Sequence, residues 1–242
     1  MKNFLLLIIL MTCLNLSSQV QMDLSKSSIK WIGKEITTKE HFGALKFSKA
    51  QLGFNGDVLT GGEFTVDMTT LDVQDLSGGG KQRLEGHLRS DDFFSVDKYK
   101  TSFLKINEVV TAEFSRITLN EKSFEIIGDL TIKDITHPIT FILERAGNSY
   151  IADLTFDRSD YNVQFRSGSF FENLGDKLIL DDIKLEVTLV KKKMKLKDKP
   201  ICSCGNTSNP NGYCDDNLVI LNRNNIEKNL KDKLSPWKKR LL

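Results

Sequence analysis

The chain has 242 residues, with 34 basic and 32 acidic side chains, so its formal charge at pH 7 is only +2. This balance gives no reason to expect nucleic acid as a partner or strong attraction to an anionic surface. After an amino-terminal signal, roughly 220 residues remain, which is enough for one domain with a substantial core and an appendage.

The amino terminus has the features of an export signal. Lys2 precedes an unbroken apolar run over residues 4–11, which is long enough for a signal peptide but too short to span a bilayer. Small side chains near Ser17 indicate cleavage, so residues 1–18 are assigned to a signal peptide and the mature protein to the periplasm or the outside of the cell. The sequence up to Cys13 weakly resembles a lipoprotein box, but the preceding threonine favours plain secretion.

From residue 29 to residue 190, apolar side chains recur mainly at every second position, as in Phe64, Val66 and Met68. This spacing is typical of strands with one buried face. Asn55-Gly56 is the strongest hairpin signal. About eight short strands without a long helical pattern predict an all-β antiparallel sheet, and closure into a barrel would remove its exposed edges. A barrel of that strand number can enclose one ligand.

One segment of the body is predicted to be helical. Three glycines at 78–80 let the chain leave the sheet and enter a short helix over residues 81–92. Phe93 and Phe94 follow directly and, as large aromatic side chains, are expected to be buried. We predict that they close one mouth of the barrel.

The composition changes after Val190, where six lysines fall within residues 191–199. Residues 192–242 are predicted to form a basic linker, a cysteine-containing loop and an amphipathic helix over residues 225–242. The loop carries three cysteines, an odd number that cannot pair completely within one chain. The body is therefore expected to fold without disulfides.

Several motifs recur in order along the body. They are Trp31, His41-Phe42-Gly43 with Leu45 and Phe47, Gly61-Gly62 before Phe64, the helical segment with Val96 to Tyr99, Gly128 to Lys133 with Thr136-His137-Pro138, and Asp157 to Tyr161. Taken together, these motifs resemble those of the YceI-like polyisoprenoid-binding proteins. The resemblance covers residues 23–191. It implies an eight-stranded lipocalin-like barrel that binds a polyisoprenoid, such as a quinone or a prenyl carrier lipid, without turnover and without a required cofactor.

Inward-facing apolar side chains predict a hydrophobic pore whose affinity comes from buried area, at roughly 25 cal/mol per Å². The candidate lining residues are Phe47, Phe64, Val66, Phe93, Phe94, Phe103, Leu130, Ile132, Phe141, Phe156, Leu185 and Val187. Each of them would also be expected in a solid core, so the sequence leaves open whether the barrel is hollow.

The polar residues of the body give little support to catalysis. The three histidines fall in separate segments without the paired spacing of metal ligands, and no nucleophile or phosphate-loop motif occurs, so we expect no enzyme. Arg158 and Arg166 lie near acidic residues and are expected to form salt bridges on the barrel surface. A clamp for a lipid headgroup is the alternative.

The cysteine loop supports two alternative functions of the tail. Cys202, Cys204 and Cys214 resemble the ligands of a CDGSH-type iron-sulfur loop, but Leu218 stands where that loop has its histidine. A degenerate loop, or one with a disulfide from Cys204 or Cys202 to Cys214, is therefore expected rather than a cluster. A metal there would make the protein a redox carrier. The basic C-terminal helix would instead suit an interaction protein that docks on a partner or on membrane phosphates. The sequence does not decide whether two barrels form a homodimer.

Overall fold

The computed structural model describes residues 18–37, 39–55, 58–111 and 123–193. The cysteine loop, the C-terminal helix and residues 1–17 of the predicted signal peptide lie outside these residues. The described elements are β1 (Ser18–Gln21), β2 (Ser28–Lys34), β3 (Glu40–Asn55), β4 (Val58–Val73), α2 (Gly78–Arg89), β5 (Thr101–Thr111), β6 (Ser123–Ile132), β7 (Ile135–Ala146), β8 (Ser149–Asp157), η1 (Arg158–Tyr161), η2 (Gly175–Lys177) and β9 (Asp182–Val190), where η denotes a 3-10 helix.

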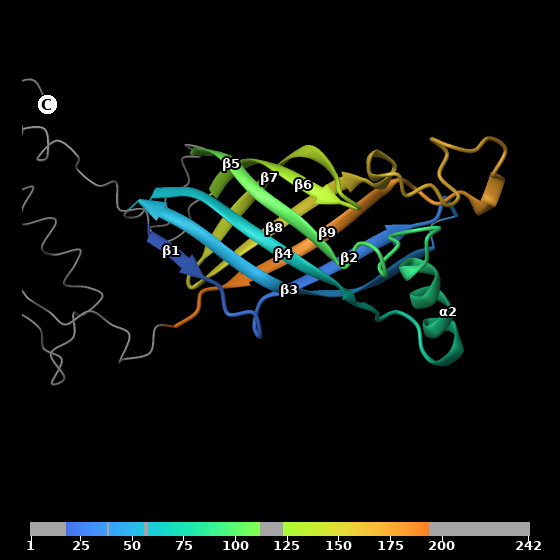
Figure 1. Ribbon diagram of the computed structural model, residues 1–242, viewed down its shortest axis with the longest axis horizontal. Helices are drawn as coiled ribbons and strands as arrows, with labels where there is room; N and C mark the ends of the chain where they lie inside the picture. Colours follow the sequence, from blue (N-terminus) through green and yellow to red (C-terminus); the bar gives the residue numbers. More distant parts are fainter. Residues whose placement is uncertain (1–17, 38, 56–57, 112–122, 194–242) are drawn as a thin grey trace, which may run out of the picture. The chain divides into compact units, whose positions relative to one another are not determined.

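The strands form a closed antiparallel barrel, as predicted. Each of β3 to β8 pairs with the next strand along the chain, and β2 joins β9 on one side to β3 on the other, which closes an eight-stranded ring (Figure 1). β1 pairs with the second half of β3, from Gln51 to Phe54. Closure leaves no long unpaired strand edge in the ring, which removes the usual template for aggregation.

The predicted alternation of apolar and polar side chains is confirmed by burial. Along β8, Tyr150, Ala152, Leu154 and Phe156 are buried and the residues between them face outward. β6 repeats this pattern over its ten residues. The inward side chains form one core cluster that runs through the barrel. Because the side-chain period of a strand is two, a shift of one residue in register would expose this whole set.

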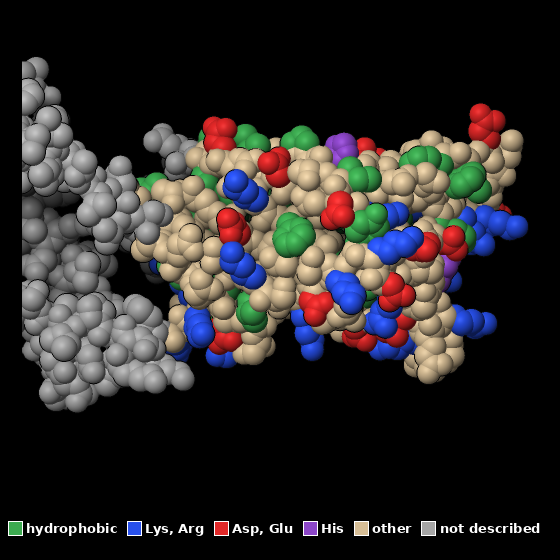
Figure 2. Space-filling view, viewed as in Figure 1, with side chains coloured by type: hydrophobic (Ala, Val, Ile, Leu, Met, Phe, Trp, Pro, Cys, Tyr) green, Lys and Arg blue, Asp and Glu red, His purple; other side chains and the backbone are tan. Residues whose placement is uncertain are grey.

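The outer face of the barrel carries ion pairs between neighbouring strands. Lys49 on β3 lies 2.7 Å from Glu63 on β4, and Lys184 on β9 lies 3.1 Å from Asp153 on β8. On the face drawn in Figure 2, basic and acidic side chains are interspersed and hydrophobic side chains stand singly. Exposed pairs of this kind contribute little to stability, so the core holds the barrel together.

No helix among the described residues is long and apolar enough to cross a membrane.

β3 and β4 are long strands that bend around the barrel through irregularities in their pairing, one of them between Ala44 and Lys46. Gly43 lies beside this point. A Cβ atom there would be 1.9 Å from the carbonyl oxygen of Asp72 and 2.6 Å from the ring of Trp31. Glycine is therefore required where the backbones of β3 and β4 and the indole of β2 approach each other.

The helix was predicted over residues 81–92 but spans Gly78–Arg89. Its first turn consists of the three glycines, which the prediction placed in a connection. It ends at Arg89, because Ser90 is extended, with ψ near 173°, and its N–H and hydroxyl donate hydrogen bonds to the carbonyl of His87. The helix is bonded to β4: Glu85 accepts a hydrogen bond from the backbone N–H of Val73 at 2.9 Å, and Lys81 pairs with Asp72 at 2.6 Å.

Candidate functional site

A cavity of about 230 Å³ lies inside the barrel at the end that carries α2. A smaller hollow of about 70 Å³ continues it toward the middle of the barrel. The two share five wall residues: Ile29, Val66, Ser102, Leu130 and Leu185. The barrel is therefore partly hollow, and its walls are almost entirely apolar. The larger cavity is close to the lower end of the range for small-molecule sites.

All twelve predicted lining residues border these two spaces. The larger cavity is bordered by Val66, Phe93, Phe94, Leu130, Ile132, Phe156 and Leu185. The smaller hollow is bordered by Phe47, Phe64, Val66, Phe103, Leu130, Phe141, Leu185 and Val187. That these residues contact a ligand stays a prediction.

Phe103 differs from the other members of the predicted set, because its side chain is 43% exposed. Its neighbours on β5, Ser102 and Leu104, are the residues that alternate into the barrel with Ile106. Most of the Phe103 ring therefore faces outward. The strand register assigns the inward position to Ser102 rather than to Phe103.

Apart from Phe93 and Phe94, sequence reasoning missed the wall residues that come from outside the strands. Leu84, His87 and Leu88 of α2 border the larger cavity, and so do Phe165 and Ile179 from the segment between β8 and β9. The three helical residues have the i, i+3, i+4 spacing of one helix face, a signal that was available. The residues of the segment after β8 have no periodicity that could have revealed them.

Phe93 and Phe94 lie at the end of the barrel that carries α2, and an aromatic cluster forms around them. Phe93 is 5% exposed, and its ring centre lies 5.1 Å from that of His87 and 5.6 Å from that of Phe165. Phe94 is half-buried and its ring centre is 6.0 Å from that of Phe93. This cluster, formed by His87, Phe93, Phe94 and Phe165, is called the mouth cluster below.

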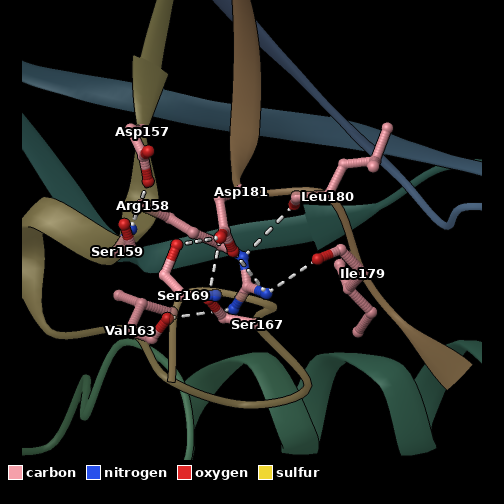
Figure 3. Close-up of polar contacts among 9 residues, drawn as sticks. All are labelled: Asp157, Arg158, Ser159, Val163, Ser167, Ser169, Ile179, Leu180 and Asp181. Carbon is pink, nitrogen blue, oxygen red and sulfur yellow. Dashed lines mark hydrogen bonds and ion pairs between the residues drawn. The ribbon is translucent and has the colours of Figure 1, made fainter. Parts of the chain in front are cut away.

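Arg158 holds the segment after β8 in place over the mouth. The expectation of a surface salt bridge is wrong for this residue, whose side chain is completely buried. Its guanidinium donates hydrogen bonds to the carbonyls of Val163 at 3.0 Å, Ile179 at 3.2 Å and Leu180 at 3.3 Å (Figure 3). Buried backbone carbonyls need donors where water is excluded, and the guanidinium supplies them to residues 163, 179 and 180.

The charge of Arg158 is balanced by Asp181, whose carboxylate lies 3.1 Å from the guanidinium. The other carboxylate oxygen accepts hydrogen bonds from the hydroxyls of Ser167 at 2.8 Å and Ser169 at 2.9 Å (Figure 3). Burial lowers the pKa of Arg158, while Asp181 and Asp157 act in the opposite direction. The network is a structural anchor, and its guanidinium is not free to bind a headgroup. Arg166 is exposed and lies over the ring of Phe165 at 5.0 Å.

His41 borders the larger cavity from β3 but is engaged by Asp75. Its Nδ1 lies 2.6 Å from the Asp75 carboxylate, whose other oxygen accepts the backbone N–H of Phe42 at 3.1 Å. Burial alone would raise the pKa of Asp75, but the hydrogen bonds from His41 and Phe42 outweigh it and leave the pKa lowered. The pair ties the start of β3 to the chain that leads into α2.

Tyr161 closes the 3-10 turn η1 at the same end of the barrel. It is 2% exposed, and its ring meets those of Phe156 and His137 nearly edge-on, at 5.6 Å and 5.4 Å. Burial, with a smaller effect from Asp160, raises the pKa of Tyr161 to about 12. The turn is thus packed as part of the core.

The described residues contain no group of three or more histidine, cysteine or acidic side chains that could hold a metal ion. Cys202, Cys204 and Cys214 lie outside the described residues, so the redox alternative and the expected disulfide stay predictions. The same is true of docking through the C-terminal helix.

Comparison with known proteins places this architecture in a family. The sequence pattern of the YceI-like domain matches residues 21–191. The UPF0312 protein SA2479 of Staphylococcus aureus strain N315 is 25% identical over 178 residues, which are 69% of this chain and 92% of that protein.

A solved structure shares the fold. BcnA of Burkholderia cenocepacia aligns with a TM-score of 0.53 at 20% identity, over 71% of this chain and 99% of BcnA. A polyisoprenoid-binding domain from Saccharophagus degradans, implicated in plant cell wall breakdown, aligns with a TM-score of 0.49 at 13% identity, over 74% of this chain and 99% of that domain.

Proposed function

The chain belongs to the family of YceI-like domains, and we propose that its barrel binds a polyisoprenoid or a similar amphipathic lipid, such as a quinone or a prenyl carrier. The apolar cavity that continues from the mouth toward the middle of the barrel supports this proposal. Each buried methylene contributes about 0.8 kcal/mol, so a five-carbon prenyl unit contributes on the order of 4 kcal/mol before the cost of ordering the chain. A few such units suffice for tight binding.

The proposed role is binding rather than turnover. Among the described residues, no hydrogen bond joins the imidazole of His41 or His87 to a serine or cysteine, so neither histidine activates a nucleophile there. His41 is held by Asp75, and the guanidinium of Arg158 is used by the anchor of the mouth. Burial of hydrocarbon needs none of these groups to react.

We also propose that the protein acts outside the cytoplasm, in the periplasm or secreted. The apolar run over residues 4–11 supports export, and cleavage near Ser17 would leave the barrel strands β2 to β9 complete. The mass of the mature protein purified from the producing cells tests this proposal. A mass that includes residues 1–17 would contradict it.

The binding proposal is tested by extracting the purified full chain with organic solvent and identifying the released lipid by mass spectrometry. Val66→Phe introduces a larger side chain into the wall shared by both spaces, and we expect it to reduce the lipid recovered per protein several-fold. Ile142→Phe adds similar bulk at a position that is 41% exposed, and we expect it to leave the lipid unchanged.

Added bulk in a core costs typically 1–3 kcal/mol, so circular dichroism must first show that both variants are folded. A wild-type protein that carries no lipid and takes up no added prenyl alcohol would overturn the proposal. Equal lipid recovery from both variants would overturn the assignment of the cavity as the binding site.

A further inference from the structure

The indole of Trp31 carries a hydrogen-bond donor that the protein does not use. Trp31 lies in the middle of β2, is 8% exposed and borders the larger cavity. Its Nε1 is buried and has no hydrogen-bond partner. Strand pairing with Gly43 on one side and Leu185 on the other fixes the backbone at this position.

A buried donor without a partner is costly. Leaving such a group unsatisfied costs about 1–3 kcal/mol, and native proteins rarely tolerate it without a reason. An apolar aromatic residue would provide similar packing at this position without that cost. Because an indole N–H can donate but not accept, the missing partner must be an acceptor atom.

A second residue on the wall of the same cavity, His87 of α2, also carries an unused polar atom. Nε2 of His87 is buried and has no partner, while Nδ1 of the same ring faces Asp92 at 4.0 Å. The ring is held edge-on by Phe93 and Phe165 of the mouth cluster. An imidazole nitrogen can donate or accept, so this atom suits a hydroxyl or a carbonyl equally.

The charged residues around the cavity argue against an anionic group at this position. Lys34 lies 3.1 Å from Glu40, and Glu35 lies 3.8 Å from Lys39, so both are already paired. Arg166 is exposed at the rim, where it also borders an outer polar hollow. Burying a charge without a partner is far more costly than burying a neutral oxygen.

We propose that the ligand has a neutral head with an acceptor oxygen, a hydroxyl or a carbonyl, which lies in the larger cavity and accepts a hydrogen bond from Nε1 of Trp31. This inference rests on the proposed function and assigns the orientation of the lipid. The head lies beneath the mouth cluster, and the hydrocarbon extends into the smaller hollow, where Ser102 is the one polar residue on the wall among the described residues.

Two probes with the same carbon skeleton test this assignment. Farnesol carries a hydroxyl group and farnesene does not. Dissociation constants for both are measured on the full chain and on Trp31→Phe, which keeps an aromatic ring and removes the donor. Lys133→Ala is the control, because Lys133 borders the outer polar hollow, where a head left outside the mouth would lie.

We expect Trp31→Phe to weaken farnesol binding about five- to tenfold, the loss of one hydrogen bond, and to change farnesene binding less than about twofold. Lys133→Ala should change neither. An equal loss for both probes would assign Trp31 to packing and overturn the inference, as would a farnesol-specific loss in Lys133→Ala alone or no change in Trp31→Phe. If neither probe binds the unaltered chain, the proposed function itself fails.

Discussion

Replacing Arg158 by methionine removes the charge at the centre of the mouth anchor and keeps a side chain of similar length. Three backbone carbonyls lose their donors, and Asp181 loses its counter-charge while keeping the hydroxyls of Ser167 and Ser169. The perturbation therefore falls on residues 158–181 and on the ring of Phe93, which the guanidinium faces at 5.5 Å, and the substitution changes no strand residue.

The expected cost follows from these contacts. Each buried carbonyl left without a donor costs about 1 kcal/mol or more, and breaking a buried ion pair by removing one partner costs about 3–5 kcal/mol in all. We expect Arg158→Met to lower the free energy of unfolding by that amount, a large share of the ~5–15 kcal/mol typical of a domain. Arg166→Met is the matched control, since this exposed arginine has a cation–π contact with Phe165, and we expect a change of about 0.5 kcal/mol or less.

The measurement is urea unfolding followed by circular dichroism, combined with hydrogen exchange of the backbone amides. If the segment detaches alone, the global loss is smaller, but the amide of Ile179, bonded to the carbonyl of Arg166 at 3.0 Å, loses its protection. Unchanged stability together with unchanged protection in Arg158→Met would refute the assignment of Arg158 as the anchor.

Four further substitutions probe other parts of the barrel. Phe93→Ala should lower the free energy of unfolding, measured in urea, by about 3–5 kcal/mol. Phe94→Ala should lower it clearly less, because Phe94 is only half-buried. Equal losses would contradict the arrangement of the mouth cluster. Gly43→Ala should cost at least about 2 kcal/mol because the added Cβ meets a carbonyl at 1.9 Å, and a thermal midpoint equal to wild type would argue against that close approach. The pKa of Tyr161 is raised to about 12 in the folded protein, against about 10 in an unfolded chain. The protonated phenol therefore makes its full contribution to the free energy of unfolding below pH ~10, and this contribution is lost as the pH rises toward 12. In Tyr161→Phe this part of the loss of stability between about pH 10 and 12 should be absent. The free energy of unfolding, measured at several pH values, checks this.

Most of the barrel can be predicted from the sequence because the pattern that defines a strand is local. A period of two assigns each strand residue to one face, and the hairpin turns fix which strands are neighbours. Val66, Leu130 and Leu185 were found in this way. The same rule, applied strictly, would have placed Phe103 outside, since Leu104 and Ile106 on its strand alternate inward.

The mouth could not be predicted in the same way, because its contacts join residues that are distant in sequence and lack periodicity. The buried guanidinium of Arg158 donates hydrogen bonds to the carbonyls of residues 163, 179 and 180. No local sequence pattern indicates that these residues contact Arg158. An arginine beside aspartates is usually a surface group, and burial reverses that role only when a returning loop supplies acceptors. The unused donor of Trp31 is likewise visible only when all neighbours are known.

The direction in which the chain enters and leaves the barrel determines how it could be held. β1 begins at Ser18 beside Phe54, and β9 ends at Val190 beside Ser149, both at the end opposite α2 (Figure 1). A tether joined at either point would attach the barrel at the end opposite α2, so the mouth would face away from the attachment. If the barrel binds a lipid as proposed, an immobilised barrel could then exchange it with the surroundings without being released.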